Sequence, residues 1–328
     1  MAARLLAIQG QDPRGARLAV RARTAGLSAA DVDRQLGSEQ RSMLIAWLNR
    51  GTLHLVRSED YPWLHALTTP PLINESARRL GVEGISASEG ERALATIERA
   101  LADSGPQTRA QLRERLAAKG LPSEGQALFH LLFRAGVLGM LVRGPVLGRD
   151  HAFVLVRDWL GEAEALDRDQ ALAELARRFL VGHQPATDRD LAKWAGLALR
   201  DARAGLRAIG AEVEVDEAGL VRLAGRRDAG LGQLPAPRLL GAFDPVLFGW
   251  TSREAIVGPH RQLLTANGLF RPFAMVNGRA VAGWRLVRDR VAIEPLEGIA
   301  KRDRAALDAD AADVERFMAG PSSTRLSA

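Results

Sequence analysis

The strongest constraint on the fold of this 328-residue chain is a helix-start motif that occurs twice. The segments beginning at Pro106 and Pro185 share the pattern Pro-x-Thr-x-x-x-Leu. In each copy the threonine is suited to cap a helix, and the leucine to be its first buried residue. Both copies occupy the same place in a longer series of helices and strands. The sequence therefore predicts repeated units, which is a stronger indication than any one copy.

The repeated unit is predicted to be three helices followed by a β hairpin, the winged-helix variant of the helix-turn-helix. We expect the first unit in residues 1–66, the second in 88–160 and the third in 167–225. In the first unit, Ser28 is the expected cap of the second helix. A third helix is expected over residues 39–49, because Met43, Leu44, Trp47 and Leu48 would form one apolar face. Residues 52–56 alternate as a strand does.

The last part of the chain has a different pattern. Residues 226–237 are rich in glycine and proline and are predicted to be a linker. Residues 238–319 are expected to form a β-rich domain, with strands over 239–248, 273–276, 280–286 and 290–293 and a closing helix over 303–318. Asn277-Gly278 is a strong hairpin signal. The predicted fold class is α+β, with three tandem winged helices before this domain.

Charge and composition limit the function classes. The net charge is +6 and the pI is about 10.6, which indicates a polyanionic partner. Only Lys119, Lys193 and Lys301 are lysines among 45 basic residues, so part of this charge is explained by an arginine-rich, GC-biased composition. The chain has no cysteine and its six histidines are scattered, so we predict no metal site. We also expect no cofactor, because no phosphate-binding glycine loop occurs.

The location is predicted from what the sequence lacks. No apolar run approaches the ~20 residues that span a bilayer. No signal peptide is recognisable, so we expect a cytoplasmic protein without a membrane partner.

Two glutamines near the N-terminus are the first candidate site residues. Gln9 and Gln11 are spaced so that an extended segment would place both side chains on one side. Pro13 favours such a conformation at Asp12, because the residue before proline avoids the helical region. Glutamine is more often a plain surface residue, and that alternative stays open.

Several basic residues are candidate DNA contacts. Arg200, Arg203 and Arg207 form one stripe of the predicted last helix of the third unit, which suits phosphate contact or, equally, a solvated face. Arg14 follows the glutamines, and His54 lies on the first hairpin. His54 is equally well interpreted as an ordinary strand histidine.

Motifs along nearly the whole chain resemble those of the AlkZ/YcaQ group of bacterial DNA glycosylases. These motifs are Gln9 to Arg14, Gly51 to Val56, Phe243-Asp244-Pro245, Arg271-Pro272 and Gly278 to Arg285. The resemblance implies three tandem winged helices around a central DNA-binding cleft, a β-rich C-terminal part and a nucleoid-associated protein. It maps the family's Gln-apolar-Gln motif onto Gln9 and Gln11. Gly10 stands where the family has a larger apolar residue.

The resemblance also implies a chemistry. Glutamine does not titrate, so the pair cannot act as general acid or base. It can place a water on the sugar of an N7-alkylated purine, whose positive charge makes it a good leaving group once the nucleotide is extruded from double-stranded DNA. Asp12 is the one nearby group that can deprotonate this water, although an Asp-Pro turn is the commoner role.

Two other functions remain open from the sequence. One is a non-catalytic winged-helix DNA-binding or transcription regulatory protein, and the other is a protein whose winged helices bind proteins. Regulators of this kind usually dimerise to contact paired half-sites. Three units in one chain need no second copy, so we expect a monomer.

Overall fold

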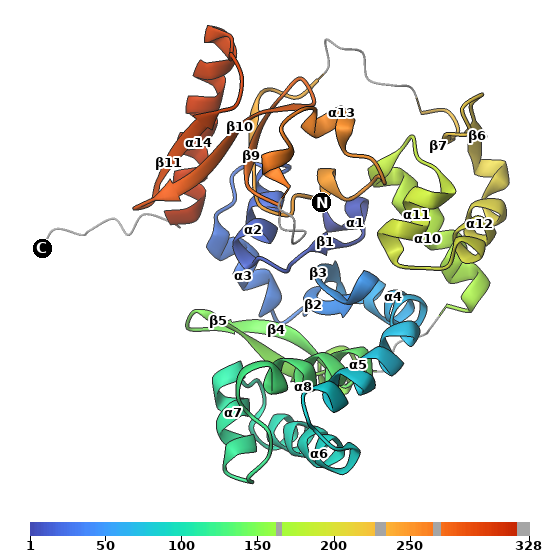
Figure 1. Ribbon diagram of the computed structural model, residues 1–328, viewed down its shortest axis with the longest axis vertical. Coiled ribbons are helices and arrows are strands. Elements are labelled where there is room, and N and C mark those ends of the chain that lie inside the picture. The colour runs from blue at the N-terminus through green and yellow to red at the C-terminus, as the bar shows by residue number, and fades with distance from the viewer. Residues whose placement is uncertain (162–165, 227–233, 265–269, 320–328) are drawn as a thin grey trace, which may run out of the picture.

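The computed structural model describes residues 1–161, 166–226, 234–264 and 270–319. Its fold is α+β, with helices packed around antiparallel sheets (Figure 1). Most of the predicted linker, residues 227–233, lies outside the described part of the chain. Within that part, no helix is long and apolar enough to cross a membrane.

A five-stranded antiparallel sheet lies at the centre, in the order β1-β3-β2-β4-β5. Its strands are β1 (Ile8–Gln9), β2 (Met43–Leu48), β3 (Thr52–Arg57), β4 (Leu141–Leu147) and β5 (Asp150–Leu155). Ile45 of β2 pairs with Arg143 of β4, which joins the hairpin of the first predicted unit to that of the second. The two hairpins therefore share one sheet.

The prediction of a helix over residues 39–49 is wrong, since Met43–Leu48 forms strand β2. Its side chains alternate between two cores: Ile45 and Trp47 face one, and Leu44, Ala46 and Leu48 face the other. A central strand that is buried on both faces is apolar throughout, so its short run has no period that separates it from a helix.

The second and third predicted units have the expected order of elements. The second contains α6 (Ala87–Ser104), α7 (Arg109–Ala117) and α8 (Gly125–Val137) before β4 and β5. The third contains α10 (Arg168–His183), α11 (Asp188–Ala195) and α12 (Leu199–Ala208) before β6 (Val213–Val215) and β7 (Val221–Leu223). Thr108 and Thr187 cap α7 and α11 as predicted, each in a capping box.

The N-terminal part places short helices around β1. They are α1 (Ala2–Leu5), α2 (Pro13–Arg21) and α3 (Ala29–Leu36), and Ser28 caps α3 as predicted. Two helices without a sequence prediction, α4 (Tyr61–Thr68) and α5 (Pro70–Val82), connect β3 to the second unit, and α9 (Val156–Leu160) follows β5. Apolar residues of α4 and α10 join the core on one face of the sheet, and those of α6 to α8 join the core on the other.

The C-terminal part is a second antiparallel sheet, in the order β11-β10-β9-β8. Its elements are β8 (Arg238–Leu240), α13 (Glu254–Val257), β9 (Phe273–Val276), β10 (Arg279–Val287), β11 (Arg290–Pro295) and α14 (Lys301–Ala319). The predicted turn at Asn277-Gly278 is confirmed, with φ values of 48° and 80°. The strand predicted over residues 239–248 is wrong beyond Leu240, because the chain turns at Phe243 into a short 3-10 helix.

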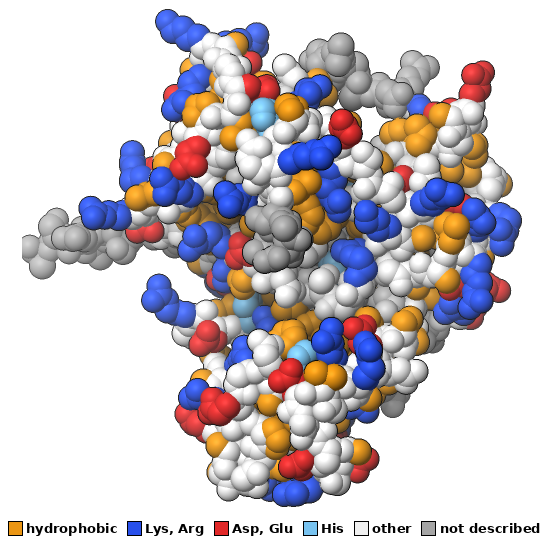
Figure 2. Space-filling view, viewed as in Figure 1, with side chains coloured by type: hydrophobic (Ala, Val, Ile, Leu, Met, Phe, Trp, Pro, Cys, Tyr) orange, Lys and Arg blue, Asp and Glu red, His pale blue; other side chains and the backbone are white. Residues whose placement is uncertain are grey.

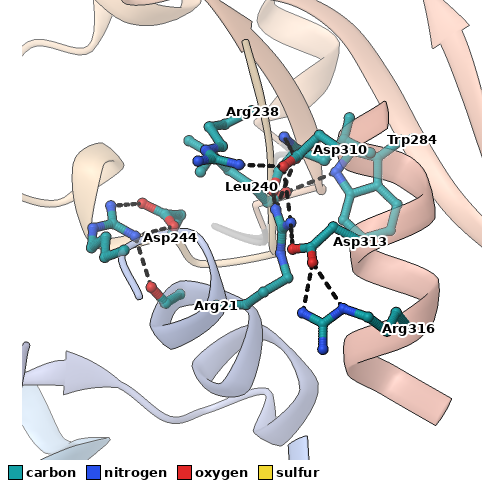
Figure 3. Close-up of polar contacts among 11 residues, drawn as sticks. Arg21, Arg238, Leu240, Asp244, Trp284, Asp310, Asp313 and Arg316 are labelled. Atoms are coloured by element: carbon teal, nitrogen blue, oxygen red, sulfur yellow. Dashed lines mark hydrogen bonds and ion pairs between the residues drawn. The ribbon is translucent and has the colours of Figure 1, made fainter. Parts of the chain in front are cut away.

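Buried ion pairs join α2 to the C-terminal part (Figure 3). The Arg21 guanidinium contacts Asp310 and Asp313 of α14, both at 2.9 Å, and donates to the backbone oxygen of Leu239 at 2.8 Å. Arg238 contacts Asp310 at 2.7 Å. Burial by itself would raise the pKa of Asp310, but its bonds to Arg21, the Leu239 amide and Arg238 outweigh this and hold that pKa below its ordinary value.

Close backbone contact positions α2 as well. A Cβ on Gly15 would lie 2.2 Å from the carbonyl oxygen of Ala242, so only glycine fits at this position. The helix that follows Gln11 is thereby held directly against the segment that leads to Phe243.

Candidate functional site

Gln9 lies on the edge strand of the central sheet. Strand β1 pairs with β3, and Gln9 is directly opposite His54. The predicted extended conformation is thus present at Gln9. Gln9 is only 7% exposed, and its side-chain oxygen Oε1 is buried without a hydrogen-bond partner among the described residues. A buried acceptor in this state is available to a water or a ligand.

His54 is buried beside Gln9, with 3% exposure. Its Nδ1 donates to the backbone oxygen of Thr52 at 2.9 Å. Burial, reinforced by the positive charge of Arg50, lowers the pKa of His54 to about 3 despite this hydrogen bond. The imidazole is therefore neutral at pH 7. The sequence made His54 a candidate DNA contact, but the structure places it beneath the surface.

Gln11 and Asp12 lie where β1 leads into α2. Gln11 is exposed, and its Oε1 accepts a hydrogen bond from the Leu53 amide at 3.3 Å. Asp12 caps α2 by accepting from the Arg14 amide at 3.0 Å, and the Arg14 side chain is exposed. Gln9 thus lies opposite His54, and Gln11 bonds the residue before His54. We call Gln9, Gln11 and His54 the Gln9 site.

Gly10 lies between the two glutamines and donates to the Leu53 oxygen at 2.7 Å. A Cβ at Gly10 would have its nearest neighbours at 3.6 Å, which is ordinary van der Waals contact. This position therefore accepts a small side chain, and the hydrogen bond to Leu53 holds the motif against β3.

The predicted arginine stripe is on α12, at the outer side of α10 and away from β1 (Figure 1). Arg200, Arg203 and Arg207 are all exposed. Arg203 bonds Asp188 of α11 at 2.6 Å, and Arg200 has Asp201 at 3.9 Å. The structure does not bring this stripe to the Gln9 site.

An aromatic group near the site was missed by the sequence reasoning. The rings of Phe248 and Phe270 are 4.8 Å apart, and Phe243 lies within 5.8 Å of Phe270. Buried Asp244 fixes this turn by accepting from both terminal nitrogens of Arg23, at 2.8 and 2.6 Å. The motif Phe243-Asp244-Pro245 was the available signal, but the sequence assigned it no role.

Three basic residues were also missed: Arg50 and Arg253, which lie over the rings of Phe248 and Phe270, and Lys193, whose ammonium bonds the Thr251 oxygen. Arg50 lies in the turn between β2 and β3, and the sequence indicated only a turn there. Figure 2 shows one face of the molecule, on which Lys and Arg side chains gather around the middle. Over the residues that the structure describes, no group of three or more His, Asp or Glu side chains is placed to hold a metal ion.

Comparisons with known proteins agree on one family. The family described as "DNA glycosylase AlkZ-like" matches residues 2–317. The chain is 29% identical over 338 residues to an "Interstrand DNA cross-link repair glycosylase" of Streptomyces sahachiroi, covering 95% of this chain and 88% of that protein. The solved structure of the Streptomyces sahachiroi DNA glycosylase AlkZ superimposes with a TM-score of 0.75 at 24% identity, over 96% of this chain and 89% of that one. This chain therefore belongs to the AlkZ-like DNA glycosylase family.

Proposed function

We propose that this protein is a DNA glycosylase that hydrolyses the N-glycosidic bond of N7-alkylated purines, including those in crosslinks. The observation that carries the proposal is the buried, unpartnered carbonyl oxygen of Gln9 beside a neutral histidine. The name of the Streptomyces sahachiroi relative, a cross-link repair glycosylase, supports the choice of substrate class.

The proposed reaction suits a site of neutral groups. An N7-alkylated base is already cationic, so it departs without protonation by the enzyme. The protein then has to extrude the nucleotide, stabilise the oxocarbenium-like sugar and place a water. The free lone pairs of Gln9 Oε1 can hold that water or face the sugar cation, and a carboxamide does so without the large desolvation cost of a buried carboxylate.

The other motif residues have supporting roles in this proposal. Gln11 already shares its oxygen with the Leu53 amide, so we assign it to positioning β1 and contacting DNA with its exposed amide group. Asp12 is proposed to deprotonate the water, although its contact with the Arg14 amide is that of a helix cap. His54, which is neutral, is proposed to orient Gln9 rather than to transfer a proton.

The fold supports double-stranded DNA as the substrate. We propose that the protein binds duplex DNA as a monomer, through the second and third units, whose helices and hairpins have the winged-helix order, and through the basic face in Figure 2. The first unit has its hairpin in the same sheet as the second, and we propose that it carries the chemistry.

The test is base release. Purified protein is incubated with a duplex containing one N7-alkylguanine, and alkali then cuts the abasic sites. We expect cleavage above the spontaneous rate. Gln9→Ala should lower the rate about 10²-fold, at the low end for a placed hydrogen-bonding group, because the cationic base departs readily by itself. DNA affinity should change little, because the interaction is made mostly in the transition state.

Gln40→Ala is the matched control, since Gln40 is exposed in the turn before β2. It should keep the wild-type rate. If wild type releases no base from several alkylated duplexes but binds them, the non-catalytic DNA-binding function is favoured instead. If base is released and Gln9→Ala keeps full activity, the enzyme class stands and the assignment of Gln9 does not.

A further inference from the structure

Three basic residues lie on separate segments that contact one another, and we call them the cation cluster: Arg50, Lys193 and Arg253. The Arg50 guanidinium donates to the backbone oxygen of Trp194, and to that of Lys193 at 3.3 Å. The Lys193 ammonium donates to the Thr251 oxygen, also at 3.3 Å, and so links α11 to the segment that carries Arg253.

The position of Arg50 is built into the fold. Its backbone is held at φ 58° and ψ 16°, in the left-handed region that non-glycine residues seldom occupy. A Cβ on Gly196, at the end of α11, would lie 2.9 Å from the Arg50 amide nitrogen. The tip of the β2–β3 hairpin therefore fits against α11 only because residue 196 is glycine. Such strain at a fixed side chain is typical of functional positions.

In the part of the chain that the structure describes, no acidic side chain neutralises Arg50 or Arg253. Among the described residues, neither guanidinium has a carboxylate within ion-pair distance, and Arg253 bonds only the Leu247 oxygen, at 2.7 Å. Burial and the positive charge of Arg253 lower the pKa of Arg50 to about 10, and burial lowers the pKa of Arg253. Two partly buried cations that repel each other call for an anion between or above them.

Aromatic rings lie beneath both guanidiniums. Arg50 lies 5.8 Å from the Phe248 ring centre and Arg253 lies 5.1 Å from that of Phe270, while the two rings contact each other at 4.8 Å. Cation–π contact holds each guanidinium flat and keeps its remaining N–H groups available. Arg50 is also close enough to His54 to lower its pKa, and His54 is the direct neighbour of Gln9.

We propose that Arg50 and Arg253 bind one backbone phosphate of DNA, next to the nucleotide whose base is released at the Gln9 site. The inference rests on the proposed function for the identity of that nucleotide. A phosphodiester is the anion that these cations lack, and arginine matches its geometry with paired N–H groups. The alkylated base is itself cationic and would be repelled by the cluster, so the cluster serves the backbone rather than the base.

The test removes the charge first from a DNA phosphate and then from the arginine. Duplexes carry a tetrahydrofuran abasic analogue and one uncharged methylphosphonate linkage, moved step by step around that analogue. Wild type should lose roughly tenfold in affinity at one linkage, the size of one hydrogen bond to a charged group. Arg253→Gln should lose a similar factor on the unmodified duplex and nothing further at that linkage. Its salt slope, d log K/d log [salt], should be smaller by about 0.9.

Arg304→Gln is the control, because it removes the same charge from an exposed position on α14, where Arg304 pairs with Asp308. It should behave as wild type at every linkage. Arg50→Gln should repeat the Arg253→Gln result. Arg50→Lys keeps the charge, so it should again lose affinity when that one linkage is uncharged, as wild type does. These two variants keep the test informative if one substitution impairs folding.

The outcomes separate the two proposals, since affinity for the abasic analogue does not require base release. Coupling of Arg50 or Arg253 to one linkage in a protein that releases no base would uphold the phosphate site and reject the proposed activity. The phosphate site would be overturned if the protein releases base but no single methylphosphonate linkage lowers the affinity more than the others, in wild type and in both Gln variants.

Discussion

Arg21 and Arg50 are both removed from solvent to a large degree, yet the protein treats their charges in opposite ways. Arg21 is met by Asp310 and Asp313, and Arg23 close by is met by Asp244 (Figure 3). Among the described residues, Arg50 is met by backbone oxygens, an aromatic ring and another cation, and by no carboxylate. The bonds of Arg21 raise its pKa although burial opposes this, whereas burial and Arg253 lower the pKa of Arg50.

The difference separates a structural from a functional arginine. Carboxylates at the cation cluster would stabilise the free protein, but they would also cancel the positive potential that a nucleic-acid backbone requires. Carboxylates at Arg21 carry no such penalty, because that network lies between α2 and α14 and joins two parts of one chain. An arginine by itself therefore does not indicate the DNA-binding surface. An arginine without a carboxylate partner does.

The largest effect on the free energy of unfolding is expected from breaking the ion pair of Arg21 with Asp310. Asp310→Ala leaves Arg21 and Arg238 without their shared carboxylate and should lower the free energy of unfolding by roughly 3–5 kcal/mol. Urea unfolding at pH 7 measures it. Asp308→Ala on the same helix removes an exposed partner of Arg304 and should change stability by less than about 1 kcal/mol. Equal effects of the two variants would mean that the Arg21 network contributes no more than a surface pair.

The next largest effect is on the pH dependence of stability and should come from His54, whose pKa of about 3 in the folded protein lies far below the ordinary histidine value. Between about pH 6.5 and pH 3 the unfolded chain binds a proton that the folded protein does not, so stability falls as the pH drops through this window. By itself His54 should remove about 2 kcal/mol at pH 5 relative to pH 7. His54→Gln should flatten the pH dependence of urea unfolding by that amount. Parallel curves for the two proteins would contradict the assigned burial.

A smaller effect on stability is expected at the uncompensated arginines. Arg253→Gln removes a partly buried charge that has no carboxylate partner among the described residues, while an amide can still donate to the Leu247 oxygen. The free energy of unfolding should stay within about 1 kcal/mol of wild type or rise. Thermal and urea unfolding measure it, beside Asp310→Ala. A loss as large as that of Asp310→Ala would show that Arg253 serves the fold, and the comparison with Arg21 would then fail.

The smallest effect is expected from the arginines of α12. Replacing Arg200, Arg203 and Arg207 together with Ala should leave stability nearly unchanged, because all three are exposed. DNA affinity should fall, and the salt slope d log K/d log [salt] should become smaller. The change in slope should be less than that expected for losing three phosphate contacts, since Asp188 already neutralises Arg203. Titration of a duplex at several salt concentrations measures the slope. An unchanged slope would mean that this stripe does not touch DNA.

Part of the fold could be predicted because the responsible interactions are local. The caps at Ser28, Thr108 and Thr187 each bond an amide three residues ahead, and Asn277-Gly278 closes a turn within the same few residues. The extended conformation at Asp12 likewise follows from its neighbour Pro13. Strand β2 could not be predicted in this way, because its two faces are set by cores from α6–α8 and from α4 and α10.

The same division holds for the candidate site. Gln9 and Gln11 were identified from a motif, and motif residues are contiguous in the chain. His54 was noticed, but its neutral, buried state depends on the pairing of β1 with β3 and on Arg50. Arg50, Lys193 and Arg253 are far apart in sequence and surrounded by ordinary residues, so no local pattern could have joined them.

By itself, the sequence determined the family motifs, the capped helices, the C-terminal hairpin and the basic character of the protein. These depend on residue identity and on contacts between near neighbours. The tertiary structure alone decided that two hairpins share one sheet. Among the residues that the structure describes, it also decided that Gln9 Oε1 has no hydrogen-bond partner, and that Arg21 has carboxylate partners while Arg50 and Arg253 have none. Those features depend on which distant segments meet, and so on the packing of the whole chain.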